Sequence, residues 1–251
     1  MKDKKEIFAR AVILQGFDDR VVLEMDWGDN TRPIKEREEE RVMMREWFSD
    51  KGYDSYMTED EKAFFELPIG EKKFKKNELE IMDVRCKAMD IILWALQISE
   101  LTDLTEYAIK NNHEVLNICR EHNHLSEVEK YSLRSADELE LQKDIEFLWN
   151  WRMNKVDIKA TKGANHHITD MIEAEFGNRY DEAIKSISLY KPRIKTSSAD
   201  FVTWNLVVRE LYKWQILLLK GMTYWRYHAL CWILDEEMRW QEESLKFFGD
   251  Y

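Results

Sequence analysis

Apolar residues recur every three or four positions along most of the chain, the spacing that places them on one face of a helix. Residues 34–50 show this pattern and are followed by Gly52, a residue type that commonly ends a helix. We therefore predict a helix over Ile34–Asp50. Its inner side is expected to consist of Val42, Met43, Trp47 and Phe48.

A second helix is predicted over Glu78–Ile98. Its second half reads AMDIILWALQI and is apolar on nearly all sides. A helix of this kind has to be surrounded by other elements, because an apolar surface on every side needs burial. We expect this segment to form the buried centre of the fold, with Trp94 as a core residue.

Three short sequence signals mark where helices begin. In each, a polar residue is followed three positions later by Glu, so that both side chains can accept hydrogen bonds from free N–H groups of the first turn. The pairs are Thr58 with Glu61, Asn77 with Glu80, and Ser135 with Glu138. The last pair opens a long helix whose inner face is predicted to contain Leu141, Ile145, Leu148, Trp149, Arg152 and Val156.

The remaining segments are less regular. Residues 1–30 are treated as an N-terminal extension, in which Ile7–Leu23 fits one or two short helices or a strand pair. Only 8 Gly and 3 Pro occur among the 251 residues, too few for a sandwich or barrel with many tight turns. We predict an all-α fold in which residues 1–251 form a single multi-helix domain. Its further helices are predicted over Leu104–Cys119, Asn165–Ser188, Ala199–Leu219 and Gly221–Glu243.

The stretch from Gly221 to Trp240, GMTYWRYHALCWILDEEMRW, is dense in aromatic residues. It holds three of the ten Trp residues, two Arg and one His. Aromatic side chains bury a large apolar area, and their polar atoms need partners when buried. We expect a Trp-rich C-terminal helix here, with Trp232 in the core, and this helix is the best candidate for a binding site.

Charge and cysteine usage narrow the class of protein. The formal net charge of −11 argues against a general affinity for nucleic acid or an anionic membrane, and it favours a basic protein partner. The three cysteines are widely spaced, as expected for reduced thiols. The first residues lack the apolar run of a signal peptide, and the longest apolar stretches are too short to span a membrane. We expect a cytoplasmic protein and leave its oligomeric state open.

Most of the histidines give no sign of a metal site. His113, His122 and His124 lie near one another in the sequence, and His166 is followed by His167. Their spacing fits no established zinc pattern, and neither CxxC nor HExxH accompanies them. Nucleophile elbows, phosphate-binding glycine loops and dinucleotide fingerprints are absent from the sequence as well. We expect no metal and no cofactor, and we identify no catalytic residue.

His228 differs because its neighbours are aromatic. In one interpretation it is a core histidine with one hydrogen-bonded nitrogen. In the other, Arg226 and His228 are the polar groups of an aromatic-walled ligand pocket. Arg226 is expected to stack on an aromatic ring or to pair with a buried carboxylate, and a structural role is favoured for it. The candidate pocket residues are Arg226, His228, Tyr224, Trp232, Trp94 and Arg85.

Four segments occur in the order found in a known family. They are MTEDEKAFFELP at residues 57–68, VRCKAMDIILWAL at 84–96, LRSADELELQKDIEFLWNW at 133–151, and WRYHALCWIL at 225–234, which is followed by Trp240. Together they resemble the bacterial domain-of-unknown-function family numbered 4272 over about Thr31–Glu243. The last segment is similar to the family's R-x-x-A-L-x-W, which is matched by Arg226, Ala229, Leu230 and Trp232. The family's WAL is matched by Trp94, Ala95 and Leu96.

The chain departs from the family pattern at several positions. Cys231 stands where the family usually has Asn, Val84 where an aromatic residue is common, and Lys87 where an acidic residue is usual. The acidic pair expected after the last Trp is Gln241-Glu242 here. The resemblance implies an α-helical domain of bacterial origin, and it implies no established activity.

Three functions are compatible with these sequence features. The leading hypothesis is a non-enzymatic binding or interaction protein, such as an accessory protein or an immunity-like partner that neutralises another protein. The alternative is a hydrolase-like or small-molecule-binding enzyme that uses Arg226, His228 and nearby carboxylates. A scaffold component of a larger assembly would need a large exposed apolar patch, for which Trp27 and Trp204 are candidates. An enclosed pocket would favour the enzyme, and a flat acidic or apolar face would favour the binding protein.

Overall fold

The computed structural model describes residues 1–25, 32–101, 104, 124–154, 196–197, 200–203 and 206–240. Its helices are α1 (Lys4–Glu24), α2 (Ile34–Asp50), α3 (Glu59–Glu66), α4 (Lys76–Arg85), α5 (Ala88–Ala95), α8 (Ala136–Asn154) and α11 (Lys213–Leu234). Short 3-10 turns are η1 (Tyr53–Tyr56), η2 (Leu125–Lys130) and η5 (Val208–Glu210). The strands described are β1 (Thr196–Ser197), β2 (Asp200–Thr203) and β3 (Leu206–Val207). The predicted all-α class is confirmed.

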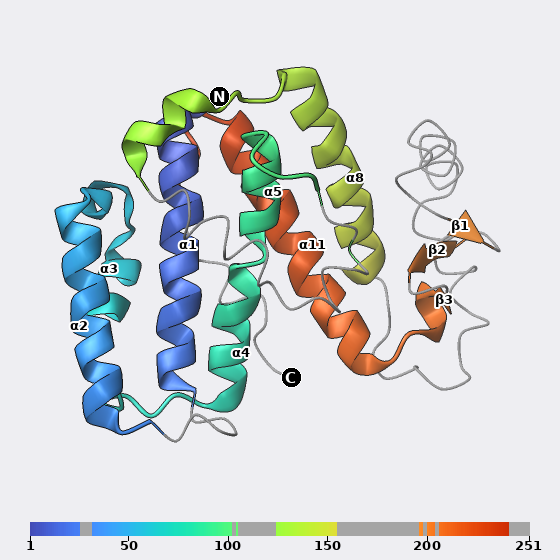
Figure 1. Ribbon diagram of the computed structural model, residues 1–251. Helices are drawn as coiled ribbons and strands as arrows, with labels where there is room; N and C mark the ends of the chain where they lie inside the picture. Colours follow the sequence, from blue (N-terminus) through green and yellow to red (C-terminus); the bar gives the residue numbers. More distant parts are fainter. Residues whose placement is uncertain are drawn as a thin grey trace.

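The helices are arranged around α1, α4 and α5. On one side α1 contacts α2 and α3, and on the other it contacts α4 and α5 (Figure 1). The C-terminal helix α11 packs against α4 and α5 as well, and α8 packs on α11. Elements from the two ends of the sequence thus enclose α4 and α5, which places α11 next to charged residues of the N-terminal half.

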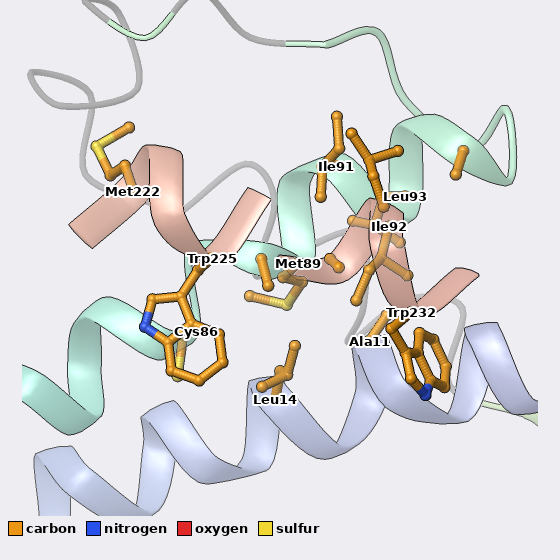
Figure 2. Close-up of a cluster of buried hydrophobic side chains, with 14 of the residues drawn as sticks. Ala11, Leu14, Cys86, Met89, Ile91, Ile92, Leu93, Met222, Trp225 and Trp232 are labelled. Carbon is orange, nitrogen blue, oxygen red and sulfur yellow. The ribbon is translucent and has the colours of Figure 1, made fainter. Parts of the chain in front are cut away.

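The core confirms the predicted central helix. All eight residues of α5 are buried. Side chains of α1, α5 and α11 meet in this core, with Leu14, Met89, Ile92 and Trp225 among them (Figure 2). Trp94 and Trp232 are both buried, as the apolar pattern of their helices predicts.

Residues 4–24 form a regular element that periodicity did not identify. The single 21-residue helix α1 replaces the short helices or strand pair considered for this segment. Every residue from Ile7 to Phe17 is buried. A helix enclosed on all sides lacks a polar face, so its sequence shows no clear helical stripe. The segment is part of the core.

The helix predicted over Glu78–Ile98 is divided into α4 and α5. The backbone N–H groups of Cys86 and Lys87 bond to the carbonyls three residues earlier, at 3.0 and 3.1 Å, which tightens the chain into a turn between the two helices. The start of α4 also differs from the prediction, because Lys75 is the N-cap. Its N–H donates to Glu78 at 2.7 Å, whereas the prediction placed the start of the helix at Asn77, whose side chain lies outside the described part of the chain.

The other two predicted helix starts are confirmed. Thr58 accepts a hydrogen bond from the N–H of Glu61, and Glu61 accepts one from the N–H of Thr58. Ser135 and Glu138 form the same reciprocal pair at the start of α8. On α8, Ile145, Trp149 and Arg152 are buried as predicted and Leu148 is half-buried, whereas Leu141 is exposed and Val156 lies outside the described residues.

The C-terminal part differs most from the prediction. In place of the first half of a helix over Ala199–Leu219, β2 pairs antiparallel with β1 and with β3, in a register that sets Thr196 opposite Phe201 and Val202 opposite Val207. β-Branched residues such as Val202 and Val207 fit this extended backbone. Helix α11 then runs without interruption from Lys213 and ends at Leu234, nine residues before the predicted end.

Two glycines allow helices to approach closely. A Cβ atom on Gly221 of α11 would lie 2.2 Å from Cγ1 of Val84 on α4. A Cβ atom on Gly16 of α1 would lie 2.3 Å from the ring of Phe48 on α2. Gly221 was expected to begin a helix, but it lies inside α11, where the missing side chain makes room for α4.

Several predicted features lie outside the described residues. These are the helices over Leu104–Cys119 (apart from Leu104) and Asn165–Ser188, four histidines (His113, His122, His166 and His167), and two tryptophans, Trp27 and Trp204. Cys86 is buried and Cys231 is half-buried, and both are free thiols. None of the helices in the described ranges combines the length and apolar character needed to cross a membrane.

Candidate functional site

Aromatic residues of α11 gather around the ring of Trp240. Trp225, His228 and Trp232 are spaced by three and four positions, so they share one helix face. Trp240 follows the helix and contacts all three, with ring centroids 6.0, 4.9 and 5.3 Å away, respectively, so the chain after α11 folds back along the helix. The ring of Tyr224 stacks on His228 at 6.1 Å. We call these five residues the aromatic cluster.

A buried carboxylate with two guanidiniums lies next to the aromatic cluster. Arg10 of α1 donates from Nη1 to both oxygens of Glu61, at 2.7 and 2.8 Å, and from Nη2 to the carbonyl of Tyr56 at 2.7 Å. Arg85 of α4 donates to Glu61 as well. Burial alone would raise the pKa of Glu61, but the two guanidiniums and the N–H of Thr58 outweigh it and lower that pKa. We call Arg10, Glu61 and Arg85 the Glu61 network.

The Glu61 network and the aromatic cluster are in contact. The guanidinium of Arg10 lies 4.9 Å from the ring centroid of Trp240, and that of Arg85 lies 5.9 Å from the ring of Trp225. Burial, and then the positive charges of Arg85 and Arg10, lower the pKa of His228 to about 4. His228 is therefore neutral at pH 7, in a position where positive charge is disfavoured.

A second ion network lies on another face of α11. Arg226 donates from Nη2 to Asp90 of α5, and its Nη1 lies 3.6 Å from Oε1 of Glu146 on α8. Gln142, also on α8, donates to the same Glu146 oxygen at 2.9 Å. Burial raises the pKa of Glu146; Arg226 and Gln142 offset part of that shift, and the nearby charge of Asp90 adds to it. We call Asp90, Glu146 and Arg226 the Arg226 network.

The six predicted pocket residues fall into more than one region. Those in or beside the aromatic cluster are Arg85, Tyr224, His228 and Trp232. Arg226 lies two positions from both Tyr224 and His228, and residues two positions apart on a helix point in directions roughly 200° apart. It therefore faces away from the aromatic cluster and belongs to the Arg226 network. Trp94 lies elsewhere, with the guanidinium of Arg134 4.6 Å from its ring. The structure thus brings four of the six together around Trp240.

Four residues of this region were not among the predicted site residues. Arg10 and Glu61 contribute to its charge, and Trp225 and Trp240 contribute two of its rings. The sequence had identified Glu61 for its role at the start of α3 alone, because the capping signal is local while its arginine partners are distant in the sequence. Trp240 had been noted for the family resemblance. Within the described ranges, no group of three His, Cys, Asp or Glu residues is placed to hold a metal ion.

Helix α2 buries two arginines. Arg37 donates to the carbonyl of Leu23 at 2.8 Å, and Arg41 donates to the carbonyl of Phe65 at 2.8 Å. These carbonyls lie in the last turns of α1 and α3, where backbone acceptors lack partners within the helix. Glu38 accepts two further bonds from Arg41, at 2.6 and 2.9 Å. The arginines thereby fix the rotation of α2 about its axis.

The opposite side of α2 exposes apolar residues among acidic ones. The exposed fraction is 38% for Val42 and 59% for Met43, so their predicted place on the inner side is wrong. Glu39 and Glu46 are exposed one helical turn before and after this pair. We call Glu39, Val42, Met43 and Glu46 the outer face of α2. The prediction for Val42 and Met43 was wrong because periodicity places apolar residues on the buried side of a helix. It takes no account of arginines that are buried in their place.

One comparison with known proteins gave a match. A family model described as "Domain of unknown function (DUF4272)" matches residues 1–169. The match starts at the first residue and so includes α1, and it ends before α11, whereas the resemblance was expected over about residues 31–243. The matched stretch contains every charged member of the two networks except Arg226. Neither the curated proteins nor the solved structures gave a match.

Proposed function

The chain belongs to the DUF4272 family, a domain of unknown function, and on that premise we propose that it is a non-enzymatic protein-binding domain. The outer face of α2 binds a basic segment of a partner protein. The observation that carries this proposal is the orientation of α2. The helix buries Arg37 and Arg41 and exposes Val42 and Met43 to the solvent.

The arrangement of side chains on α2 costs free energy in the isolated chain. Two arginines lose water on burial, and two partly exposed apolar side chains gain only part of the free energy that full burial would give them. The carbonyl groups of Leu23 and Phe65 compensate the arginines. The exposed surface of Val42 and Met43 stays in contact with water in the isolated chain. A partner that covers these two side chains would bury that surface.

The charge around the apolar pair favours a basic partner. Glu39 and Glu46 flank Val42 and Met43, and the chain carries a net charge of −11. A second copy of this chain would bring the same glutamates together and be repelled. An amphipathic helix with Lys or Arg beside its apolar face matches both the apolar pair and the acids. The partner is therefore a basic helical segment of another protein.

A defined peptide tests this proposal. The probe is a fluorescein-labelled amphipathic helical peptide made of Leu on one face and Lys on the other, titrated with the full chain and followed by fluorescence anisotropy. We expect saturable binding that weakens with salt, because exposed charges are screened. Replacing Val42 and Met43 by Gln should weaken binding about tenfold or more, through the loss of apolar contact. Glu39→Gln with Glu46→Gln should reduce the salt dependence.

A matched pair on α8 provides the control. Leu141 and Phe147 are also exposed apolar residues, so Leu141→Gln with Phe147→Gln should leave peptide binding unchanged. Equal weakening by both pairs of substitutions would show that the peptide binds without a preferred face, and the proposal would be wrong. It would also be wrong if the parent chain is a dimer in light scattering and the Val42 and Met43 variant is a monomer, since the face would then bind a second copy.

The enzymatic alternative has less support. A hydrolase-like site around Arg226 and His228 needs both side chains to face one substrate, yet Arg226 belongs to the Arg226 network and His228 to the aromatic cluster on another face of α11. Arg226 pairs with Asp90 and Glu146, as expected for a structural arginine. His228 has its pKa lowered to about 4, far from the neutral range in which a general acid or base is most effective.

A further inference from the structure

A buried carboxyl group of α1 meets a second carboxyl group on α4. Asp18 is 6% exposed, and its side chain shares a hydrogen bond with that of Asp83. Helices α1 and α4 pack against each other, so this bond crosses the contact between them (Figure 1). Ionised carboxylates can only accept hydrogen bonds, so a bond between two carboxyl groups requires a proton on one of them. The pair therefore holds one proton while it is hydrogen-bonded.

The surroundings of the two groups indicate which of them carries the proton. The side chain of Asp83 is 37% exposed, and its Oδ2 lies 3.6 Å from Nζ of Lys87. Solvent and this ammonium group stabilise a negative charge on Asp83, whereas Asp18 has little contact with solvent. The proton is therefore on Asp18, and Asp83 carries the negative charge of the pair.

The groups around Asp18 set the pH at which it loses this proton. Burial, and then the charge and the hydrogen bond of Asp83, raise the pKa of Asp18 to about 7. The ammonium group of Lys87 offsets part of this shift, and the charge of Asp19 adds to it. Cys86, in the turn after α4, stays neutral because burial raises the pKa of its thiol well above the ordinary value. The pair thus changes its charge in the neutral range, where few side chains titrate.

We propose that Asp18 and Asp83 form a pH-sensitive contact between α1 and α4. With the proton present, the hydrogen bond between the two carboxyl groups joins the helices. Without the proton, two negative charges lie side by side and repel each other, which weakens the contact. Because α4 also packs against α11, the charge of this pair affects how α11 is held. The contact does not depend on the partner surface of α2, so either can be absent while the other is present.

The effect on stability has a defined sign and pH range. The ordinary pKa of an aspartate is 3.8, so between this pH and about 7 the folded protein holds a proton that the unfolded chain has lost. The stabilisation by the protonated pair is complete below pH 3.8 and is lost as the pH rises to about 7. Asp18→Asn keeps a hydrogen-bond donor without a charge, so this variant imitates the protonated pair at every pH. The parent should therefore lose stability relative to Asp18→Asn up to about pH 7 and not beyond it.

Carboxyl carbon signals follow the proton directly. The full chain is labelled with ¹³C-aspartate and titrated from about pH 4 to about pH 9, and the signal of Asp18 is the one that is lost in Asp18→Asn. We expect this signal to change with a midpoint near pH 7, and amide signals of α4 to change with the same midpoint. Asp83→Asn should lower the midpoint by about one pH unit or more, because it replaces a negative neighbour by a hydrogen-bond donor.

Hydrogen exchange measures the contact between the helices. At each pH, the exchange rates of the α4 amides in the parent are divided by those in Asp18→Asn, so that the intrinsic pH dependence of exchange cancels. We expect this ratio to rise about tenfold or more between about pH 5 and pH 7.5 and to stay constant above it. Asp60→Asn is the control, because Asp60 is exposed on α3 and the ratio of parent to this variant should not depend on pH.

Three results would overturn the proposal. The first is a carboxyl signal of Asp18 that titrates below about pH 5, as an ordinary aspartate does. The second is an unchanged midpoint in Asp83→Asn, which would show that burial alone holds the proton. The third is a ratio of exchange rates that does not change with pH, which would show that the charge of the pair leaves the helix contact unaffected. If Asp18→Asn fails to fold, the midpoint in Asp83→Asn and the α4 amide signals of the parent still decide.

Discussion

The two buried ion networks have opposite compositions. The Glu61 network holds two guanidiniums around one carboxylate, and the Arg226 network holds two carboxylates around one guanidinium. Burial is nearly complete in both, since the side chains of Glu61, Asp90, Glu146 and Arg226 have almost no exposed surface. Burial acts on each carboxylate in the same direction, so the difference between the networks comes from the number of cations beside it.

The pKa values show what this difference does. The pKa of Glu61 is lowered although burial opposes that shift, whereas the pKa of Glu146 is raised. A carboxylate can release its buried charge by taking up a proton, but a guanidinium keeps its charge at any pH at which the protein folds. The Glu61 network is therefore fixed in its charged form, and the Arg226 network can adjust. The two should respond differently to mutation and to pH.

Removing the carboxylate of Glu61 should have the largest effect. Glu61→Gln removes the carboxylate that the two buried guanidiniums share, and we expect a loss of about 3–5 kcal/mol in the free energy of unfolding. Urea unfolding measures it. Glu59→Gln is the control, because Glu59 lies on the exposed side of α3 and should change stability by about 0.5 kcal/mol or less. If both variants unfold at the same urea concentration, the Glu61 network does not stabilise the fold.

Removing Arg226 should have a smaller effect that depends on pH. We expect Arg226→Ala to lose about 3 kcal/mol at pH 7 and less at pH 5, because Glu146 can take up a proton when its cation is gone. Arg226→Lys should be nearly as unstable as Arg226→Ala, since one ammonium cannot bridge Asp90 and Glu146 as the planar guanidinium does. Thermal midpoints of the three proteins at both pH values check this. Equal midpoints would exclude a structural role, and a lysine variant as stable as the parent would show that charge suffices.

The elements that were predictable are those with local signals. The bounds of α2 follow from its periodicity and from Gly52, and the starts of α3 and α8 follow from their capping pairs. The helix α1 was not recognised, because complete burial removes the polar face that periodicity relies on. The rotation of α2 was missed for a related reason, since the acceptors of its arginines are carbonyls of other helices.

The candidate site depends on pairs that are distant in the sequence. Glu61 and Arg10 are 51 positions apart, and Arg226 and Asp90 are 136 positions apart. The sequence did indicate that Arg226 would stack on a ring or pair with a buried carboxylate, and Asp90 is that carboxylate. It could not show that Arg226 joins an ion network while His228 joins the aromatic cluster, because their partners are set by how α4, α5 and α8 pack around α11.

The pH dependence of stability tests the burial of His228, on the side of α11 that faces Arg10 and Arg85. The pKa of His228 is about 4 in the folded protein, below its ordinary value of 6.5, so the folded state binds fewer protons than the unfolded state between these values. Its contribution to stability is present above pH 6.5 and is lost as the pH falls toward 4, by about 3 kcal/mol. His228→Gln should remove that part of the loss in urea unfolding. His124→Gln, at an exposed position, should keep the parent's pH dependence.

The smallest expected effect has the opposite sign. The pKa of Glu146 is raised in the folded protein, so the folded state binds more protons than the unfolded state, and stability falls as the pH rises through that raised value. Glu146→Gln resembles the protonated acid, and a side-chain amide can still accept the hydrogen bond from Gln142. The variant should therefore gain stability relative to the parent as the pH rises, which urea unfolding at several pH values measures.

The matched control for this change is Glu140→Gln, which alters an exposed carboxylate on the same helix and should leave the pH dependence as it is in the parent. Opposite slopes for the His228 and Glu146 variants would show that burial favours the neutral form of both groups, because it lowers the pKa of a base and raises that of an acid. If Glu146→Gln instead loses stability as the pH rises, Glu146 is charged in the folded protein and Arg226 holds both carboxylates ionised. The Arg226 network would then be as fixed in charge as the Glu61 network, and the contrast between them would lie in composition alone.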